Sequence, residues 1–254
     1  MSTINLKDEQ WNKIVEFLRA CPNAYVGRET QCRRFIEGVL WITRSGAQWR
    51  LLPERYGHWN SVYKRFARWS DKNIWHKLHQ HFADDPDMEH LILDSTIIRA
   101  HPCAAGASKK NGGQAEQALG RSRGGFSTKI HASVDGLGNP LRFILTAGQR
   151  HDITQAEALV IDLDFERLIA DKGYDAAEFI DLIIADYEAE VVIPSSARRT
   201  QQRHYDKHLY KERHLVECFF NKIKHYRRIF SRYEKLANRY LSFLSFVGAL
   251  IWLR

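Results

Sequence analysis

The chain has 254 residues, of which 44% are hydrophobic and 12% aromatic. This apolar content is sufficient for a packed core and excludes a generally disordered chain. The formal net charge of +8 at pH 7 favours a polyanionic partner.

The positive charge is concentrated in two segments. Residues 197–239 contain 13 Lys and Arg against 4 Asp and Glu, and residues 26–70 contain 9 against 3, whereas the remainder of the chain is net negative. Segregated basic segments are expected in a protein that contacts the phosphates of a nucleic acid. Two solvated basic faces without a ligand are the alternative that charge alone leaves open.

Cysteine usage and the most apolar run bear on the compartment. Cys21, Cys32, Cys103 and Cys218 form no CxxC pair and no regular framework, which predicts reduced thiols in a cytosol. The most apolar run, residues 240–253, has 14 residues, fewer than the roughly 20 that a membrane-spanning helix needs. We therefore expect no membrane partner and a buried C-terminal helix.

Residues 1–85 predict a small all-helical N-terminal domain. Apolar residues recur with helical spacing within residues 11–18, 36–43, 59–69 and 74–82. The segment ADDPD that follows predicts the boundary with a second domain.

The third of these helices is the most basic. Its sequence places Lys64, Arg65 and Arg68 on the face opposite Trp59 and Phe66. Several short helices with the most basic one third suit a helix-turn-helix-like unit, so we predict that these three basic residues contact DNA. A plain helical cap is the alternative.

Residues 86–254 predict an α/β domain. The β-rich runs are residues 90–101, a hairpin at 126–148, and residues 165–171 and 189–194. Three strands, then a helix, strand, helix, strand and helix, predict a mixed five-stranded sheet with flanking helices. Residues 103–125, rich in Gly, Ala, Ser, Lys and Arg, predict a flexible basic loop.

Two aspartates occupy unusual positions in the predicted strands. Asp94 lies within an apolar β-rich run, where a carboxylate is costly to bury unless it is paired or bound to a metal. Asp171 ends the run RLIAD before a glycine turn, and ligands collect at the carboxyl ends of strands in open α/β sheets. A turn or capping role is an equal alternative for either residue alone.

A third carboxylate, Glu217, lies in the basic and aromatic segment YKERHLVECFFNKIKHYRR, residues 210–228. At about 100° per residue, one α-helix over this segment places Tyr210, Arg213 and Lys224 on the face of Glu217. If the three acids converge, they can hold two divalent cations about 3.5–4 Å apart. The neighbouring basic residues would then contact phosphate. A surface helix with ion pairs is the alternative.

These motifs resemble a known family. The pattern Y-x2-R-x3-E-x6-K beginning at Tyr210, LD at Asp94 and ADKGY at Asp171 are similar to those of bacterial insertion-sequence transposases of the DDE class. The nearest group is the one numbered five in the insertion-sequence classification. The resemblance covers almost the whole chain, because GAQWRLLPERYGHWNSVYKRFARW and TAGQRHD also match that group.

The resemblance implies a ribonuclease-H-like core in which Asp94, Asp171 and Glu217 bind two Mg²⁺ ions, with Mn²⁺ as a substitute. The implied reaction cuts DNA at terminal inverted repeats to expose 3′ hydroxyls and transfers them into target DNA. The implied partner is double-stranded DNA, held by a dimer or larger assembly in the bacterial cytoplasm at the nucleoid. The 45 residues between Asp171 and Glu217 leave no room for a large inserted domain.

Further residues are predicted at this site. Tyr210, Arg213 and Lys224, with Arg227 and Arg228, are the predicted DNA contacts of the second domain.

Two of three further residues near the strand ends, His151 and Tyr174, have two interpretations each. His151 either supports the metal site or makes a structural hydrogen bond, and Tyr174 either stacks on a flipped base or packs in the core. Asp152 is expected to be the N-cap of the following helix.

Two other functions remain open. A catalytically inactive or domesticated relative would bind element ends and repress, although the complete set of acids argues against it. Another ribonuclease-H-like nuclease, such as a resolvase, would only hydrolyse DNA, so transfer of a pre-cut end would exclude it.

Overall fold

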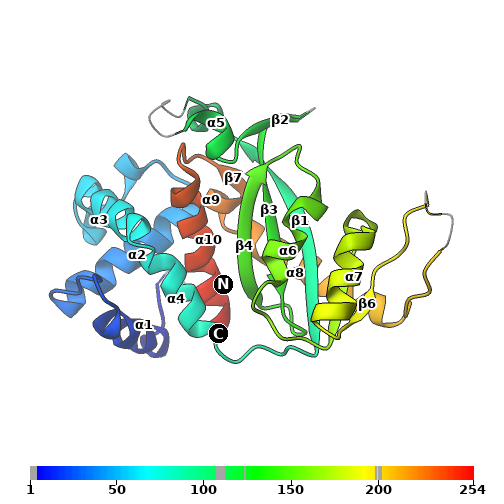
Figure 1. Ribbon diagram of the computed structural model, residues 1–254. Helices are drawn as coiled ribbons and strands as arrows, with labels where there is room; N and C mark the ends of the chain where they lie inside the picture. The colour runs from blue at the N-terminus through cyan, green and yellow to red at the C-terminus, as the bar shows by residue number, and fades with distance from the viewer. Residues whose placement is uncertain (1–4, 107–111, 123, 198, 200–201) are drawn as a thin grey trace.

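The computed structural model describes residues 5–106, 112–122, 124–197, 199 and 202–254. A group of N-terminal helices lies beside a mixed β-sheet, and the C-terminal helix lies between them (Figure 1).

The first part of the chain is helical, as predicted. It contains α1 (Asp8–Ala20), α2 (Glu29–Ser45), α3 (Trp59–Asp71) and α4 (Ile74–Phe82), with two 3₁₀ helices, η1 (Trp49–Leu51) and η2 (Glu54–Tyr56), between α2 and α3. Each α-helix buries an apolar stripe. Helix α2 ends at Gly46, whose φ of 68° lies in the left-handed region that favours glycine.

The sheet contains the five predicted strands and two short additional ones. The predicted strands are β1 (His90–Ala100), β3 (Gly125–Val134), β4 (Pro140–Ala147), β5 (Arg167–Ala170) and β6 (Glu190–Val192), and the additional ones are β2 (Gly120–Ser122) and β7 (Ser231–Arg232). Strand β1 is antiparallel to β3 and parallel to β5 and β7. Strand β3 also pairs with β2 and β4, and β6 pairs with β5. The predicted mixed α/β sheet is confirmed.

Alternation along the strands divides the core into two layers, because successive side chains point to opposite faces. Leu91 and Leu93 of β1 join the buried cluster under α6 (Ala156–Val160) and α7 (Ala177–Asp186). Ile92 joins the cluster that contains the apolar face of α8 (His214–Lys224). A helix on each face therefore follows from the two apolar faces of β1.

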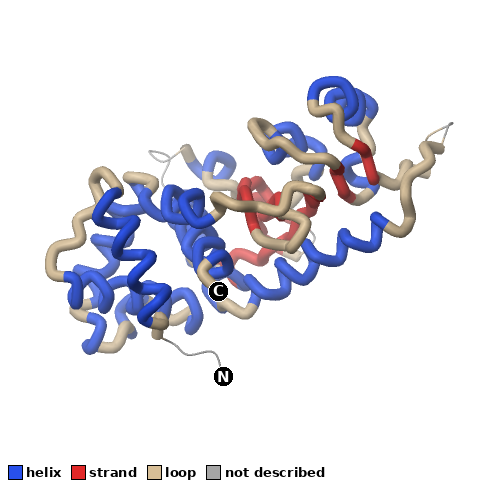
Figure 2. The backbone as a smooth tube through the Cα atoms, turned by 90° about the horizontal axis from the view of Figure 1, so that it is seen from below, coloured by secondary structure: helices blue, strands red, loops and turns tan. Residues whose placement is uncertain are grey.

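Helix α10 (Ala237–Trp252) connects the sheet to the N-terminal helices, as Figures 1 and 2 show from two directions. The ring of Phe243 packs 4.5 Å from that of Phe66 in α3, and Trp252 donates a hydrogen bond to the Pro140 carbonyl at 2.8 Å. The predicted buried C-terminal helix is confirmed. None of the described helices is long and apolar enough to cross a membrane.

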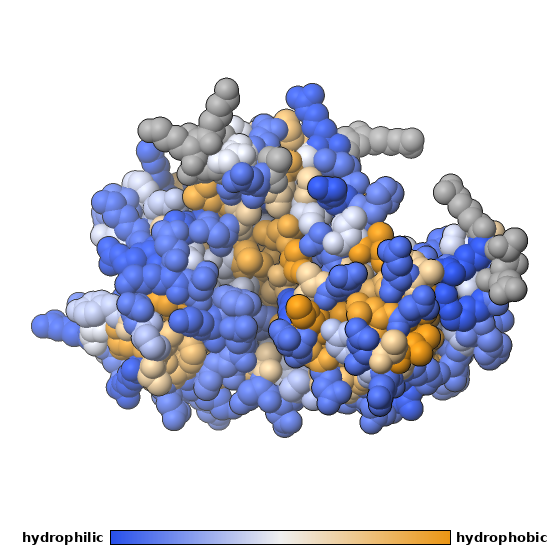
Figure 3. Space-filling model, viewed as in Figure 1, coloured by the Kyte–Doolittle hydropathy of each residue, from blue (hydrophilic) through white to orange (hydrophobic). Residues whose placement is uncertain are grey.

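The surface agrees with this layering. On the face seen in Figure 3, hydrophilic residues cover most of the N-terminal helices, and hydrophobic residues show at their junction with the sheet and around α6 and α7. Ile161, at the end of α6, and Ile184, in α7, are apolar residues with 53% and 55% of their surface exposed.

The basic segment 103–125 is not simply a loop in its described parts. It contains the end of η3 (Pro102–Ala104), α5 (Gly113–Glu116) and β2. The Ala118 carbonyl accepts hydrogen bonds from Thr128 Oγ1 and Arg232 Nη1, at 2.6 and 3.2 Å. These buried donors attach the segment to the sheet, a long-range effect that local composition does not reveal.

The segment 210–228 is not one helix. It begins as a 3₁₀ helix, η7 (Leu209–Arg213), continues as α8, and turns before the short α9 (Arg227–Phe230). Tyr226 at this turn is 7% exposed, and its carbonyl accepts the backbone N–H groups of Ile229 and Phe230. Burial of Tyr226 therefore accompanies a turn that the helical spacing did not predict.

Candidate functional site

Asp94 lies where β1 loses a neighbouring strand. The register pairs Leu93 with Ala170, the last residue of β5, and β7 joins β1 only from Arg99. Between those points, β1 pairs with β3 alone among the described strands. Asp171 follows Ala170 and is therefore next to Asp94 at the carboxyl end of β5, where ligands collect in α/β sheets.

Arg213 connects Asp94 to Glu217. Its guanidinium donates from Nη1 to Asp94 Oδ2 at 2.8 Å and from Nη2 to Glu217 Oε1. The same guanidinium carbon lies 6.0 Å from the centre of the Tyr210 ring. The structure therefore brings together three of the four residues of the predicted face, although Tyr210 and Arg213 lie on the 3₁₀ helix. Lys224 is partly buried and lies at the other end of α8, of which it is the last residue.

The third acid, Asp171, is fixed by the turn that follows it. Its Oδ1 accepts a hydrogen bond from the Gly173 N–H at 2.7 Å, which caps the 3₁₀ helix η6 (Lys172–Tyr174). A Cβ at Gly173 would lie only 2.8 Å from that oxygen. Gly173 therefore leaves the space that the Asp171 carboxylate occupies, in agreement with its predicted turn role.

Burial makes Asp94 an unusual carboxyl group. Loss of hydration raises the pKa of Asp94 to about 6, opposed by the hydrogen bond from the Ser95 N–H and by the charge of Arg213. The nearby carboxylates Asp171 and Asp152 raise it further. A cation beside Asp94 stabilises its ionised form and opposes the effect of burial.

The chemistry of these acids fits a divalent cation. Within the described part of the chain, no group of three or more His, Cys, Asp or Glu side chains is close enough to hold a metal ion. Arg213 lies between Asp94 and Glu217 here and supplies the positive charge. Carboxylate oxygens are nevertheless the ligands that Mg²⁺ prefers, and a divalent cation would stabilise the charge of the buried Asp94 carboxylate.

A fourth carboxylate, Asp152, lies close by. Its Oδ1 accepts hydrogen bonds from Ser95 Oγ at 2.7 Å and from Lys129 Nζ at 2.8 Å, and lies 3.8 Å from Nδ1 of His131. The predicted N-cap role of Asp152 is wrong by one position, because His151 is the N-cap of the 3₁₀ helix η5 (Asp152–Gln155). The signal that could have indicated this group is the pair of polar residues Lys129 and His131 in a β-rich run.

The two candidate supporting residues have structural positions. Tyr174 is fully buried, and its pKa is raised by burial and by the three aspartates around it. Its ring therefore packs in the core and is not exposed to a base. His151 is exposed, and its carbonyl accepts the Thr154 hydroxyl at 2.7 Å. Among the described contacts, no hydrogen bond joins its ring to the acids.

Two models of known protein families match this chain. A family model described as "Transposase DDE domain" matches residues 85–252, more than half of the chain. The chain belongs to the DDE transposase family. A second model, "Putative transposase of IS4/5 family", matches residues 6–79. The predicted resemblance is confirmed, and the α/β sheet is the ribonuclease-H-like fold that it implied.

Relatives of this DDE transposase include short proteins. The chain is 42% identical over 130 residues to the "Putative transposase for insertion sequence element IS6501" of Brucella ovis, covering 51% of the chain and 100% of the relative. It is 38% identical over 118 residues to the "Uncharacterized protein y4sN" of Sinorhizobium fredii, covering 46% of the chain and 94% of the relative.

A solved structure is also similar, that of a piggyBac transposase synaptic complex with hairpin DNA. The TM-score is 0.44 at 12% sequence identity, and the match covers 78% of this chain and 50% of that chain.

Some of the side chains predicted to contact DNA in this transposase are exposed, and others already interact with another part of the protein. Lys64, Arg68 and Arg227 are exposed. Arg65 instead donates to Cys32 Sγ at 3.1 Å and lies 4.4 Å from the centre of the Phe35 ring. Arg65 therefore holds helices α2 and α3 together, which argues against its predicted DNA contact.

Arg228 is also engaged within the protein. It is 6% exposed, and it donates to Glu234 Oε1 at 2.6 Å and to the Ala47 carbonyl at 2.8 Å. The burial of Arg228 and its pairing with Glu234 argue against its predicted contact with DNA.

Proposed function

We propose that this DDE transposase cuts DNA at the ends of an insertion sequence and transfers the 3′ hydroxyls into target DNA, with Asp94, Asp171 and Glu217 as metal ligands. The observation that supports it most directly is the placement of these acids. Asp94 and Asp171 follow paired positions of neighbouring strands, and Arg213 links Asp94 to Glu217.

Asp94, Asp171 and Glu217 would hold Mg²⁺, or Mn²⁺ in its place. When bound, the metal would supply Lewis-acid activation of the phosphodiester and of the attacking hydroxyl. Binding and positioning of the DNA would be carried out by residues around these acids.

Arg213 has two alternative kinds of anionic partner. Its guanidinium now binds two carboxylates, and carboxylates that bind a cation no longer need it. A guanidinium binds a phosphate with the same fork geometry as a carboxylate. We therefore assign Arg213 to the scissile region of the DNA, with the adjacent Tyr210 ring limiting its movement.

Other basic residues would guide the duplex to the acids. Lys224 and Arg227 continue from α8 into α9, and Lys64 and Arg68 are exposed on α3. Each phosphate contact contributes roughly one unit to the slope of log affinity against log salt. Joining two element ends also requires a dimer or larger assembly on DNA.

The test is a joining assay with a pre-cut element end and a supercoiled plasmid, in the presence and absence of Mg²⁺. The end sequence comes from the inverted repeats that flank the gene. We expect Mg²⁺-dependent joining, and a loss of at least about 100-fold in Glu217→Gln, the upper range for changes next to a metal site. Glu212→Gln, in the same segment, is the matched control and should retain joining.

The outcomes separate the alternatives. Joining by Glu217→Gln at the wild-type rate would remove Glu217 from the mechanism. End binding without joining in the wild-type protein would identify an end-binding repressor, and hydrolysis without joining would identify a nuclease of another kind.

A further inference from the structure

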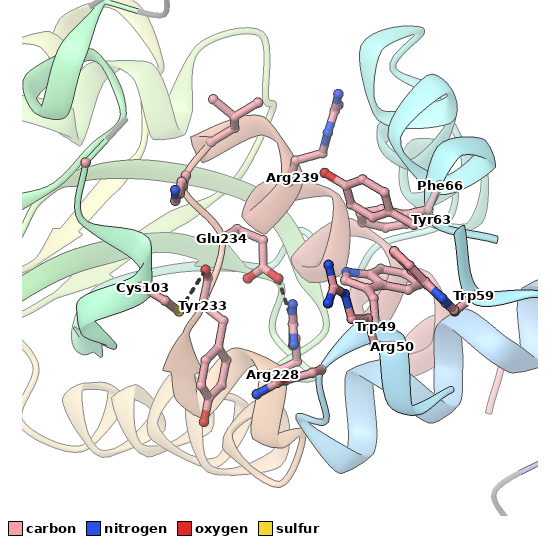
Figure 4. Close-up of a pocket in the computed structure, with 14 residues that line it drawn as sticks. Trp49, Arg50, Trp59, Tyr63, Phe66, Cys103, Arg228, Tyr233, Glu234 and Arg239 are labelled. Atoms are coloured by element: carbon pink, nitrogen blue, oxygen red, sulfur yellow. Dashed lines mark hydrogen bonds and ion pairs between the residues drawn. The ribbon is translucent and has the colours of Figure 1, made fainter. Parts of the chain in front are cut away.

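A pocket of about 700 Å³ lies away from the acids, between the N-terminal helices and the segment that joins α9 to α10. Figure 4 shows residues from η1 and α3 on one side and residues from the α9–α10 segment on the other. The pocket has an aromatic wall, formed by Trp59 and Tyr63, and a basic rim that includes Arg50 and Lys235.

The aromatic wall is supported from behind by the core. Trp49 contacts the rings of Phe66 and Tyr63, with centroids 5.3 and 5.4 Å apart. Tyr63 is 38% exposed, and Trp59 is partly buried. Rings held in this way lose little conformational entropy when a flat ligand stacks on them.

The rim carries two cations that no ion pair neutralises in the described residues. Arg239 binds both carboxylate oxygens of Asp71, and Arg228 pairs with Glu234. Arg50 and Lys235 are exposed and have no such partner in the described structure.

Arg50 also faces the aromatic wall. Its guanidinium carbon lies 5.6 Å from the centre of the Trp59 ring, so a positive charge and an aromatic face border the same space (Figure 4). A ligand that combines a flat ring with a negative charge is complementary to this arrangement.

We infer that the pocket binds an unpaired nucleotide of DNA, with its base on the wall formed by Trp59 and Tyr63 and its phosphate at Arg50 and Lys235. Aromatic side chains beside basic residues bind single-stranded DNA in this manner, with little dependence on sequence. A base within a duplex is covered by its neighbours and cannot stack on a protein ring, so the ligand is a nucleotide outside the helix.

The position of the pocket suits a nucleotide near a cut end, an aspect that rests on the proposed function. Cys103, which lines the pocket, follows the end of β1 at Ala100, and Asp94 lies six residues earlier in that strand. At about 3.3 Å per residue, this part of β1 spans roughly 20 Å. That length corresponds to roughly six nucleotides of a DNA strand.

The experiment compares two metal-free oligonucleotides of about 15 nucleotides, within the range of single-strand binding sites. One is oligothymidylate, and the other is the same backbone with abasic positions. Their affinities are measured by fluorescence anisotropy at one salt concentration. We expect the wild-type protein to prefer the thymidylate, because only that oligonucleotide has bases to stack.

Variants then separate stacking from charge. Tyr63→Ala should weaken thymidylate binding by about 5- to 150-fold, the range for one lost base stack, and leave abasic binding unchanged. Arg50→Ala should weaken the binding of both oligonucleotides. Tyr25→Ala and Lys13→Ala, exposed residues outside the pocket, are the matched controls and should keep the preference.

Equal affinity of the wild-type protein for the two oligonucleotides would overturn the inference, as would a full preference in Tyr63→Ala. Tyr63 and Arg50 are surface residues, so their substitution should leave the fold intact. Trp59→Ala is not used, because it would remove a partly buried ring. Glu217→Gln should keep the preference, so a failure of joining and a failure of nucleotide binding are measured separately.

Discussion

Two regions of this transposase pair arginine with carboxylate in opposite surroundings. At the carboxyl end of β5, Arg213 pairs with Asp94 and Glu217. The exposed fraction of the side chain is 22% for Arg213, 16% for Asp94 and 53% for Glu217. Beside the turn from α9 to β7, Arg228 pairs with Glu234, with 8% and 7% exposed. Water or another ion can replace a partner in the first region but not in the second. The first pairing is thus suited to exchange, and the second to holding the fold together.

The largest effect is expected in the buried region. Arg228→Met keeps the aliphatic stem but leaves Glu234 as a buried carboxylate without its partner, which typically costs about 3–5 kcal/mol of unfolding free energy. Urea denaturation measures this loss. Replacing Glu234 by Leu in the same protein should recover part of it, because the unpaired charge is then removed. A loss below about 1 kcal/mol in the single variant would show that the two regions do not differ.

A smaller effect is expected from the titration of Asp94. Its pKa is raised from 3.8 to about 6, so the folded protein holds this proton more tightly than the unfolded chain. The resulting stabilisation is present below about pH 4 and is lost as the pH rises through about 6, by on the order of 3 kcal/mol.

Urea denaturation in EDTA at several pH values, for wild-type protein and Asp94→Asn, measures this contribution. Asp94→Asn should lose less stability than the wild type between about pH 4 and pH 7. Parallel pH profiles would mean that Asp94 has an ordinary pKa and that the exposed region is more hydrated than its contacts indicate.

The smallest effect on stability is expected from Arg213→Met, the same substitution in the exposed region. The pair with Glu217 is open to solvent, and Asp94 can take up a proton when Arg213 is removed, so the unfolding free energy in EDTA should fall by only about 1 kcal/mol. The same variant should weaken binding of element-end DNA and reduce its salt slope by roughly one unit. Strong destabilisation with unchanged DNA affinity would reverse the roles given to the two arginines.

Much of the fold could be predicted because its signals are local. The apolar, β-rich run of β1 and the break after Asp171 located these strands, and helical spacing located α1 to α4. The additional strands β2 and β7 have two or three residues each and depend on partners distant in sequence.

The site could be predicted only where chemistry is visible in a short segment. Asp94 and Asp171 stood out as acids in or at the end of β-rich runs. Asp152 did not, because its partners Ser95 and Lys129 reach it only through the pairing of β1 with β3. Arg228 resembled its neighbour Arg227 in sequence, and only the packing of Ala47 and Glu234 around it distinguishes the two.

The two ends of α8 are attached to β1 by interactions of different strength. Near its start the attachment is the exchangeable pair of Arg213 and Asp94, and beyond its end β7 pairs with β1 while Arg232 donates to Thr128 Oγ1 at 2.6 Å in the interior. Between these two ends the apolar face of α8 packs in the core, so a displacement of Glu217 relative to β1 is a small rotation of the helix about the buried turn at Tyr226. The arm from Glu217 to that turn is about 13 Å long, so a rotation of about 5° displaces Glu217 by about 1 Å. In the proposed metal site, where metal–ligand distances vary by only about 0.2 Å, the stiffness of a turn remote from the acids would limit how accurately Glu217 is placed.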